Sequence, residues 1–221
     1  DPVAAMLFCD GNGGNISYRT ESLRQFHSLK LNVFLFDYRG YGKSRGWVTE
    51  EGTYKDAMAA YQWLKEKNRE IPIVLFGRSL GANIAADLAT KVDASALIYE
   101  SGFNSVQDLG AELFPYLPVR WVTKYKYNGI DKIKQIKIPI LVIHSPNDEI
   151  IPYHHGKKLF EEALEPKRFL EITGTHNNGF MMSEDFYLKG MQDFIGEFVL
   201  QDHEVSTRLN NDPEYGTMRN Q

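Results

Sequence analysis

The sequence has a single cysteine, no long apolar run and no excess of positive charge. Because Cys9 is the lone cysteine among 221 residues, an intramolecular disulfide is excluded and the cysteine count leaves the redox compartment open. No apolar run approaches the roughly 18 residues that a membrane-spanning helix needs. The net charge of −4 comes from interspersed acidic and basic residues, without the basic stripe typical of nucleic-acid binders. We therefore expect no DNA or RNA partner.

The first residue, Asp1, is neither an initiator methionine nor part of a signal-like segment. A cytoplasmic location is the expectation that these residues favour, and a membrane-anchored or exported protein is the alternative if an N-terminal segment has been removed. Hydrophobic residues make up 43% of the chain and charged residues 24%, a balance typical of a globular domain. A chain of 221 residues is long enough to bury a core between two layers of helices.

Short runs rich in Val, Ile, Leu and Phe alternate with longer amphipathic stretches. The short runs predict six strands, at residues 3–9, 32–37, 72–76, 94–99, 139–144 and 167–172. The amphipathic stretches predict helices at residues 17–29, 52–67, 79–90, 153–162 and 183–200. This alternation is typical of βαβ units, so we expect an α/β fold with a doubly wound, mostly parallel sheet.

One connection is too long for a simple crossover. Residues 102–132 contain six aromatic residues and two prolines, and we expect them to form a short lid, because long connections in compact domains often have a function. After residue 200 the sequence becomes polar and loses its apolar periodicity. We therefore predict an α/β domain over residues 1–200, with a lid insertion at about 102–132, and a polar tail over residues 201–221.

The third predicted strand runs directly into the sequence GRSLG at residues 77–81, and a predicted helix follows at once. A serine between two glycines at a sharp turn from strand to helix is the arrangement of a nucleophile elbow. In such a turn the serine hydroxyl is exposed, and a side chain at either glycine would crowd the neighbouring strand and helix. We expect Ser79 to be a catalytic nucleophile; a purely structural tight turn is the alternative.

A serine nucleophile needs a histidine base and an acid that orients the histidine. Of six histidines, His176 follows the last predicted strand in the loop TGTHNNGF, at the edge of the sheet where α/β folds assemble their sites. The other five fit surface or structural positions better. Asp148 follows the fifth predicted strand and yields the chain order Ser, Asp, His. Glu149 and Glu100, which follows the fourth strand, are rival acids.

The tetrahedral intermediate of acyl transfer needs two N–H donors for its oxyanion. Leu80, directly after the nucleophile, supplies the first by its position in the elbow. The loop DGNGGN at residues 10–15 follows the first predicted strand, and its glycines let a substrate carbonyl approach the main chain. We expect the N–H of Asn12 to be the second donor. A flexible turn capped by Ser17 accounts for the glycines about as well.

Aromatic residues of the predicted lid are candidates for the lining of a substrate pocket. We expect Phe103, Phe114 and Trp121 to cover an apolar acyl pocket, because apolar pockets with few polar groups suit uncharged acyl chains. Packing of the same rings onto the core is the alternative.

Together, these motifs resemble the α/β-hydrolase superfamily, and within it the Bem46-like branch of α/β-hydrolase domain-containing proteins. The resemblance rests on DGNGGN, FDYRGYGKSRG, GRSLGA, FPYLPVRW, PILVIHSPNDEIIP and GTHN, which occur in the family's order between Asp10 and about Leu200. It implies a triad of Ser79, Asp148 and His176. Two features depart from the family: Asp10 stands where a histidine is usual, and the antiparallel strand pair that usually opens the sheet is missing from the predicted strands.

The motifs and the resemblance predict a serine hydrolase that cleaves carboxylic esters or thioesters through an acyl-enzyme, without a cofactor or a metal. The expected partner is a small-molecule or lipid acyl substrate, and peripheral membrane contact through the lid is a further expectation. An aminopeptidase or acyl-peptide hydrolase on the same triad is one alternative. A non-catalytic binding protein that uses the lid as a docking surface is another. The oligomeric state is left open.

Overall fold

The computed structural model describes residues 1–13 and 16–201. Within these ranges, the side chains of Arg120 and Trp121 are not described. The predicted polar tail therefore lies outside the described residues, apart from Gln201.

The described residues form one sheet of six strands in the order β2-β1-β3-β4-β5-β6, and every neighbouring pair is parallel. The strands are β1 (Ala4–Cys9), β2 (Leu31–Leu35), β3 (Ile73–Arg78), β4 (Ala96–Glu100), β5 (Ile140–His144) and β6 (Lys167–Glu171). All six predicted strands and the doubly wound α/β fold are confirmed. The antiparallel pair that usually opens the sheet of the family does not occur among the described strands.

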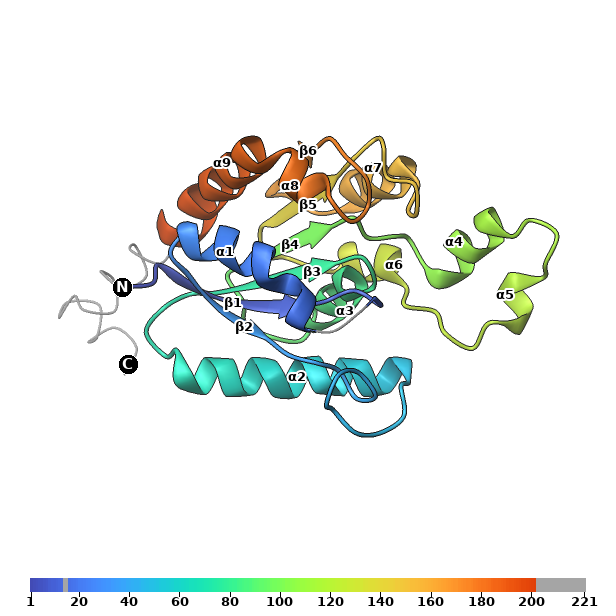
Figure 1. Cartoon of the computed structure of the whole chain (residues 1–221), viewed down its shortest axis with the longest axis horizontal. Coiled ribbons are helices and arrows are strands. Elements are labelled where there is room, and N and C mark those ends of the chain that lie inside the picture. Colours follow the sequence, from blue (N-terminus) through green and yellow to red (C-terminus); the bar gives the residue numbers. More distant parts are fainter. Residues whose placement is uncertain (14–15, 202–221) are drawn as a thin grey trace, which may run out of the picture.

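Helices cover both faces of the sheet, with α1 and α9 on one side and α2 and α3 on the other (Figure 1). Outside the lid, the helices are η1 (Ile16–Arg19), α1 (Thr20–Ser28), α2 (Glu50–Lys67), α3 (Leu80–Ala89), α7 (Tyr153–Glu162), α8 (Gly179–Met182) and α9 (Glu184–Ile195), which continues into the π-helical turn η2 (Gly196–Leu200). They confirm the five predicted helices. No helix among residues 1–13 and 16–201 has both the length and the apolar character needed to span a membrane.

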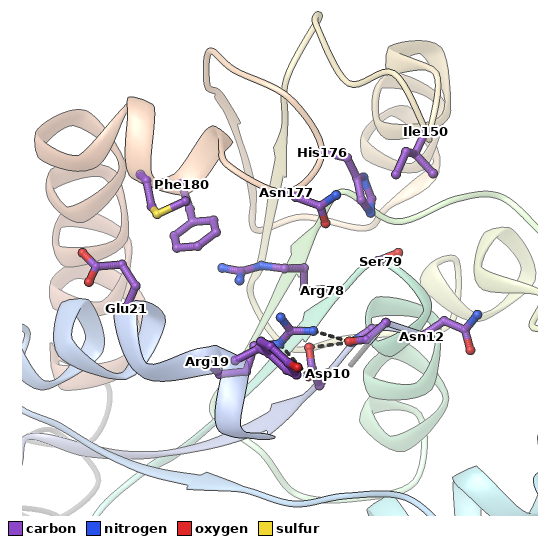
Figure 2. A pocket seen from close by; sticks show the side chains of 14 residues that line it. Asp10, Asn12, Arg19, Glu21, Arg78, Ser79, Ile150, His176, Asn177 and Phe180 are labelled. Carbon is purple, nitrogen blue, oxygen red and sulfur yellow. Dashed lines mark hydrogen bonds and ion pairs between the residues drawn. The ribbon is translucent and has the colours of Figure 1, made fainter. Parts of the chain in front are cut away.

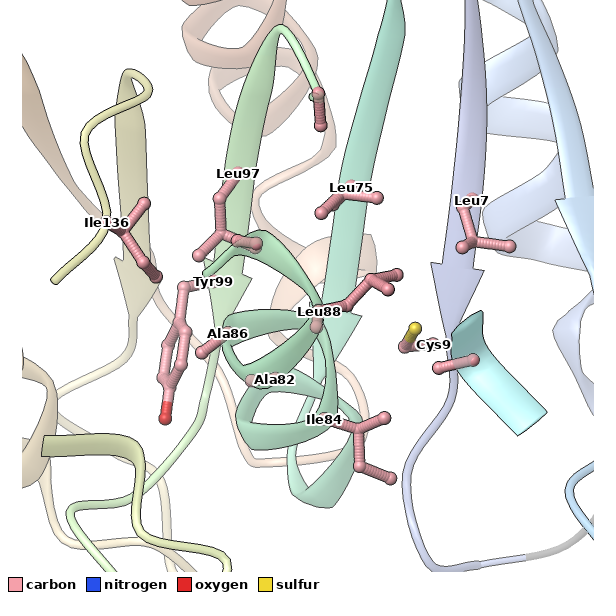
Figure 3. Packing of buried hydrophobic residues seen from close by; sticks show 14 of the residues in the cluster. Leu7, Cys9, Leu75, Ala82, Ile84, Ala86, Leu88, Leu97, Tyr99 and Ile136 are labelled. Carbon is pink, nitrogen blue, oxygen red and sulfur yellow. The ribbon is translucent and has the colours of Figure 1, made fainter. Parts of the chain in front are cut away.

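The sheet is buried on both faces, as a parallel sheet between two layers of helices requires. Alternate side chains of β1 enter different clusters: Met6 and Phe8 pack beneath α1 and α9, whereas Leu7 and Cys9 pack beneath α2 and α3. Figure 3 shows the second cluster, in which small side chains such as Ala82 line the face of α3. Because these alanines are small, α3 lies close to the strands, and its first turn is held at the edge of the sheet.

The segment predicted to form a lid, for which we keep that name, contains three short helices rather than one irregular loop. They are α4 (Val106–Leu113), α5 (Val119–Val122) and α6 (Gly129–Ile133). Figure 1 shows α4 and α5 projecting from one end of the molecule, whereas α6 lies against α3. The base of the lid is anchored to α2, because the backbone N–H groups of Lys126 and Tyr127 donate to the Glu50 carboxylate at 2.6 and 2.9 Å.

The carboxyl ends of all six strands lie at one edge of the sheet, because every neighbouring pair is parallel. The loop after β1 begins at Asp10, β3 leads into Ser79, and the loops after β5 and β6 carry Asp148 and His176. The helices that follow the neighbouring strands β1 and β3 cover opposite faces of the sheet. Ligands of α/β folds bind at such a switch point, so this edge is the place to look for a site.

Candidate active site

Ser79 lies in a strained turn between β3 and α3. Its φ and ψ are 56° and −123°, a conformation that costs a non-glycine residue about 1–3 kcal/mol. The turn is held on both sides: the Ser79 N–H donates to the Glu100 carbonyl at 2.9 Å, and the Ser79 carbonyl accepts from the Ala82 N–H at 3.0 Å. This conformation places the serine side chain directly before the first turn of α3.

The two glycines that flank this turn make contacts that no other residue could make. A Cβ at Gly77 would lie 2.4 Å from the carbonyl oxygen of Gly81, and a Cβ at Gly81 would lie 2.0 Å from the carbonyl oxygen of Cys9. Both distances are far shorter than van der Waals contact, so the crowding expected from the sequence occurs in the structure. The same close approach brings the end of β1 beside Ser79.

The structure brings His176 and Asp148 together. Nδ1 of His176 lies 2.7 Å from Oδ2 of Asp148, and Glu149 accepts a hydrogen bond from the His176 backbone N–H at 2.9 Å. His176 and Ser79 line the same cavity (Figure 2). Among the described residues no direct hydrogen bond joins the Ser79 hydroxyl to the His176 ring. In enzymes such bonds often tighten only when substrate binds, so the gap is compatible with a triad.

The carboxylate of Asp148 is held in its ionised form. Its Oδ1 accepts backbone hydrogen bonds from Ile150 at 3.0 Å and Ile151 at 2.8 Å, and Nε2 of His144 lies 3.5 Å from its Oδ2. Burial alone would raise the pKa of Asp148, but His144, His176 and the Ile151 amide outweigh burial and hold the pKa below its usual range. A carboxylate of this kind can orient the His176 ring and stabilise its charged form.

Glu100, the rival acid, is occupied by other partners. Its two oxygens accept hydrogen bonds from Nε of Arg78 at 2.5 Å and from the hydroxyl of Tyr187 at 2.6 Å, in a region where Glu100 is buried. Because Asp148 contacts the ring of His176, whereas Glu149 contacts only its backbone N–H, the geometry favours Asp148 over both Glu100 and Glu149 as the orienting acid. The partnership with Tyr187 could not be found from the sequence, since α9 is distant along the chain.

Two backbone N–H groups predicted to bind an oxyanion have no acceptor among the described residues. Leu80 is the first residue of α3, so its N–H has no partner within the helix. In the loop after β1, the Gly11 N–H donates to the Asp10 carboxylate at 2.7 Å, whereas the Asn12 N–H has no acceptor among the described residues. A Cβ at Gly11 would lie 3.8 Å from Oγ of Ser79, so this loop passes beside the hydroxyl.

The Asp10 carboxylate forms an ion pair with Arg19. Nε of Arg19 lies 2.6 Å from Oδ2 of Asp10, and Nη2 of Arg19 donates to the Gly13 carbonyl at 2.6 Å (Figure 2). Burial raises the pKa of Asp10, and the hydrogen bond from Arg19 opposes this shift. Arg19 thus ties the glycine-rich loop to η1. Arg19 was not among the predicted site residues, and only its place in the first predicted helix could have indicated it.

Two cavities meet at Ser79. The first, of about 660 Å³, has a mixed lining, in which the charged side chains of Arg19, Glu21 and Arg78 lie beside apolar side chains such as Phe180 and Met181. The second, of about 420 Å³, lies beneath the lid and has a mainly apolar lining that includes Val48, Leu80, Phe103, Val106, Leu109 and Tyr127. Ser79, Asn12 and Ile150 line both cavities. Ser79 is therefore positioned between a cavity that contains charged groups and a mainly apolar one.

Only one of the three predicted pocket residues is seen in a cavity. Phe103 lines the apolar cavity and is buried, whereas Phe114 is 55% exposed and lines neither cavity. The side chain of Trp121 lies outside the described residues. Val106 and Leu109 line the apolar cavity from α4. Their spacing of three residues is the helical signal that could have indicated them.

Glu112, His154 and His155 form a group of potential metal ligands whose ligand atoms lie within 4.8 Å of one another. Nδ1 of His155 accepts the Asn104 N–H at 3.2 Å, so the neutral ring carries its proton on Nε2, the atom 3.2 Å from Glu112. A protonated nitrogen is a hydrogen-bond donor and cannot bind a metal. We therefore interpret this group as a polar contact between α4 and α7.

The fold and the residues at its edge are those of an α/β hydrolase: the sheet is parallel, a strained serine follows β3 and a histidine follows β6. Comparisons with known proteins agree with this class. The chain belongs to the α/β-hydrolase family. A family model described as serine aminopeptidase, S33, matches residues 1–130. An uncharacterized protein of Mycobacterium tuberculosis is 38% identical over 196 residues, which cover 87% of this chain and 70% of that protein. The α/β-hydrolase domain-containing protein WAV2 of Arabidopsis thaliana is 33% identical, covering 91% of this chain and 73% of WAV2.

Two further similarities concern lipases and esterases. The lysophosphatidylserine lipase ABHD12 of Mus musculus is 29% identical over 76% of this chain, and the match spans 48% of ABHD12. The crystal structure of an esterase from Pyrococcus furiosus superposes with a TM-score of 0.74 at 18% identity, covering 90% of this chain and 83% of the esterase. At that identity the structural likeness supports the fold alone.

Proposed function

We propose that the protein is a serine hydrolase that cleaves carboxylic esters or thioesters of lipid or small acyl substrates through an acyl-enzyme. The observation that carries the proposal is the pairing of His176 with Asp148 at 2.7 Å beside a cavity that also contains Ser79 in a strained turn. Strain in a turn persists only where the surrounding structure enforces it, and such strain is concentrated at functional sites.

In the proposed reaction, Oγ of Ser79 attacks the substrate carbonyl carbon while Nε2 of His176 takes the serine proton. Asp148 accepts the hydrogen bond from Nδ1 and stabilises the charged ring. The N–H groups of Leu80 and Asn12 bind the oxyanion, and removing one such donor typically costs about 100- to 1,000-fold in rate. His176 then protonates the departing oxygen or sulfur, and a water molecule activated by His176 releases the acid and regenerates Ser79.

The two cavities suggest how the substrate is divided across Ser79. In this proposal the acyl chain lies in the apolar cavity beneath the lid, lined by Phe103, Val106 and Leu109, and the leaving group lies in the first cavity, where charged side chains are available to a polar group. ABHD12, a relative named as a lysophosphatidylserine lipase, supports an acyl-lipid substrate. No cofactor or metal takes part in the proposed steps.

A peptidase is the alternative function, since the matching family model is described as a serine aminopeptidase. An aminopeptidase must bind the α-ammonium group of its substrate, which calls for an unpaired carboxylate near the nucleophile. The carboxylates of the first cavity are already paired, Asp10 with Arg19 at 2.6 Å and Glu21 with Arg24 at 2.7 Å. This pairing favours an uncharged acyl substrate over a peptide N-terminus.

The experiment that tests the proposal compares hydrolysis of nitrophenyl esters by the native protein, Ser79→Ala, His176→Ala and the double variant. Each single variant should lose at least ~1,000-fold in kcat, and the double variant should be little worse, because the residues of a triad act as a unit. Aminoacyl nitroanilides in the same assay test the peptidase reading. Native activity retained in Ser79→Ala would overturn the proposal. Equal turnover of anilides and esters would indicate that the protein is a peptidase instead.

A further inference from the structure

The end of the molecule that carries the lid exposes large apolar side chains. We call this surface the lid tip; its members are Trp47, Leu113, Phe114, Tyr116, Leu117 and Val122. Tyr116 is 98% exposed, Trp47 88% and Val122 71%. Scattered exposed apolar residues are ordinary, but a group of this kind within one short segment and one adjacent loop marks an interaction site.

The lid tip draws on two segments that are joined at the base of the lid. Leu113 to Val122 belong to α4, α5 and their connection, whereas Trp47 lies on the loop between β2 and α2. The hydroxyl of Tyr125 donates to the Val48 carbonyl at 3.2 Å and so joins the base of the lid to that loop. Figure 1 shows this loop beside the start of α2, on the side of the molecule from which α4 and α5 project.

Exposed basic side chains flank the lid tip. Lys43 and Arg45 precede Trp47, and Lys124 and Lys126 follow Val122. None of these four side chains forms an ion pair among the described residues. The surface therefore combines apolar and aromatic side chains with unneutralised positive charge, which complements an anionic surface with an apolar interior.

The lid tip is also continuous with the apolar cavity at Ser79. Val48, next to Trp47, and Tyr125, close to Val122, both line that cavity. An acyl chain that left a lipid layer at the lid tip would therefore reach the cavity without crossing the polar side of the molecule.

We propose that the lid tip is a docking surface for anionic lipid bilayers, into which the lid inserts its apolar side chains while the basic residues contact the headgroups. A projecting, narrow group of side chains suits a deformable lipid layer. A stable protein interface needs a broad, complementary face of about 800 Å² on each partner. Vesicle binding is measured without substrate turnover, so its outcome is independent of the proposed hydrolase activity.

The test measures sedimentation of the protein with vesicles of phosphatidylcholine, with and without phosphatidylserine. The native protein should bind the phosphatidylserine vesicles more tightly. Phe114→Ser should weaken binding by about tenfold, since Phe114 is 55% exposed and its ring enters the lipid. Phe186→Ser is the matched control, because Phe186 is 57% exposed on α9, away from the lid, and should bind as the native protein does. Lys43→Glu with Lys124→Glu should abolish the preference for phosphatidylserine.

Folding of each variant is checked by its melting temperature, which should not change for such exposed positions, and turnover of a water-soluble acetyl ester should stay at the native level. Equal binding by Phe114→Ser and Phe186→Ser would overturn the proposal. Failure of the native protein to bind either kind of vesicle would also overturn it. A native dimer that dissociates in Phe114→Ser would overturn it as well, because the lid tip would then be an interface with a second copy of the chain.

Discussion

At the scale of single residues, the strained turn at Ser79 is the feature that needs the most support. The cost of about 1–3 kcal/mol is met by hydrogen bonds on both sides of the turn and by the buried helix that follows. Arg78, the residue before the serine, forms a buried ion pair with Glu100, whose own carbonyl accepts the Ser79 N–H. The position of the hydroxyl is thus fixed by residues of two neighbouring strands.

The lowered pKa of Asp148 predicts that the stability of the folded protein depends on pH. Because its pKa is lower in the folded state than in the unfolded chain, Asp148 adds stability above its unfolded pKa of about 3.9, and this contribution is lost as the pH falls through the folded value. Asp148→Asn should therefore lower the free energy of unfolding by about 1–3 kcal/mol near neutral pH, and the difference from the native protein should shrink below about pH 4. Denaturant titrations at several pH values measure this; a difference that does not vary with pH would contradict it.

Cys9 should be inert toward thiol reagents in the folded protein. Its side chain is completely buried, and burial raises the pKa of the thiol to about 12, so the reactive thiolate is scarce. Iodoacetamide at about pH 8 should leave both Cys9 and ester hydrolysis unchanged, and should alkylate Cys9 once the protein is unfolded. Mass spectrometry of the intact protein reads out the modification. Loss of activity on alkylation of the folded protein would mean that this thiol is exposed or takes part in the reaction.

At the scale of elements, the sequence predicted the regular parts well and the lid poorly. Strands buried on both faces produce apolar runs that stand out in any sequence, and the glycines around Ser79 mark the elbow. The lid was predicted as a long connection because prolines and aromatic residues hide its helices. Yet Ser105 caps α4 by accepting the Asp108 N–H at 3.0 Å, and a serine at this position could have indicated the start of a helix in the sequence. Phe114, one residue beyond α4, turns outward, which composition alone cannot reveal.

The position of Leu109 on α4 predicts that the lid limits the length of the acyl chain. Leu109 lines the apolar cavity, so Leu109→Trp should fill part of its volume of about 420 Å³ and shorten the chain that fits. The ratio of kcat/KM for a long-chain nitrophenyl ester to that for the acetyl ester should fall about tenfold.

Leu113→Trp is the control for this change, because Leu113 lies on the same helix, is 47% exposed and lines neither cavity. Its selectivity should match that of the native protein. An unchanged ratio in Leu109→Trp, or an equal change in both variants, would show that the acyl chain does not occupy this cavity.

At the scale of the whole molecule, the site is assembled from residues that are far apart in the chain and adjacent only in the parallel sheet. Ser79, Asp148 and His176 could be predicted because each follows a strand, and all strands end at the same edge. The partners that hold them could not be predicted in the same way. Arg19 and Tyr187 reach their carboxylates from helices on the sheet face, and such side-chain contacts leave no mark in sequence spacing.

The central claim is that Ser79 is a nucleophile activated by His176. The most direct measurement is labelling with a fluorophosphonate, which reacts only with an activated serine, followed by mass spectrometry of the peptide that contains Ser79. We predict one adduct per chain, located on Ser79, absent in Ser79→Ala and strongly slowed in His176→Ala. A native protein that fails to label, or an adduct on another residue, would contradict the account and favour a binding protein that uses the same fold.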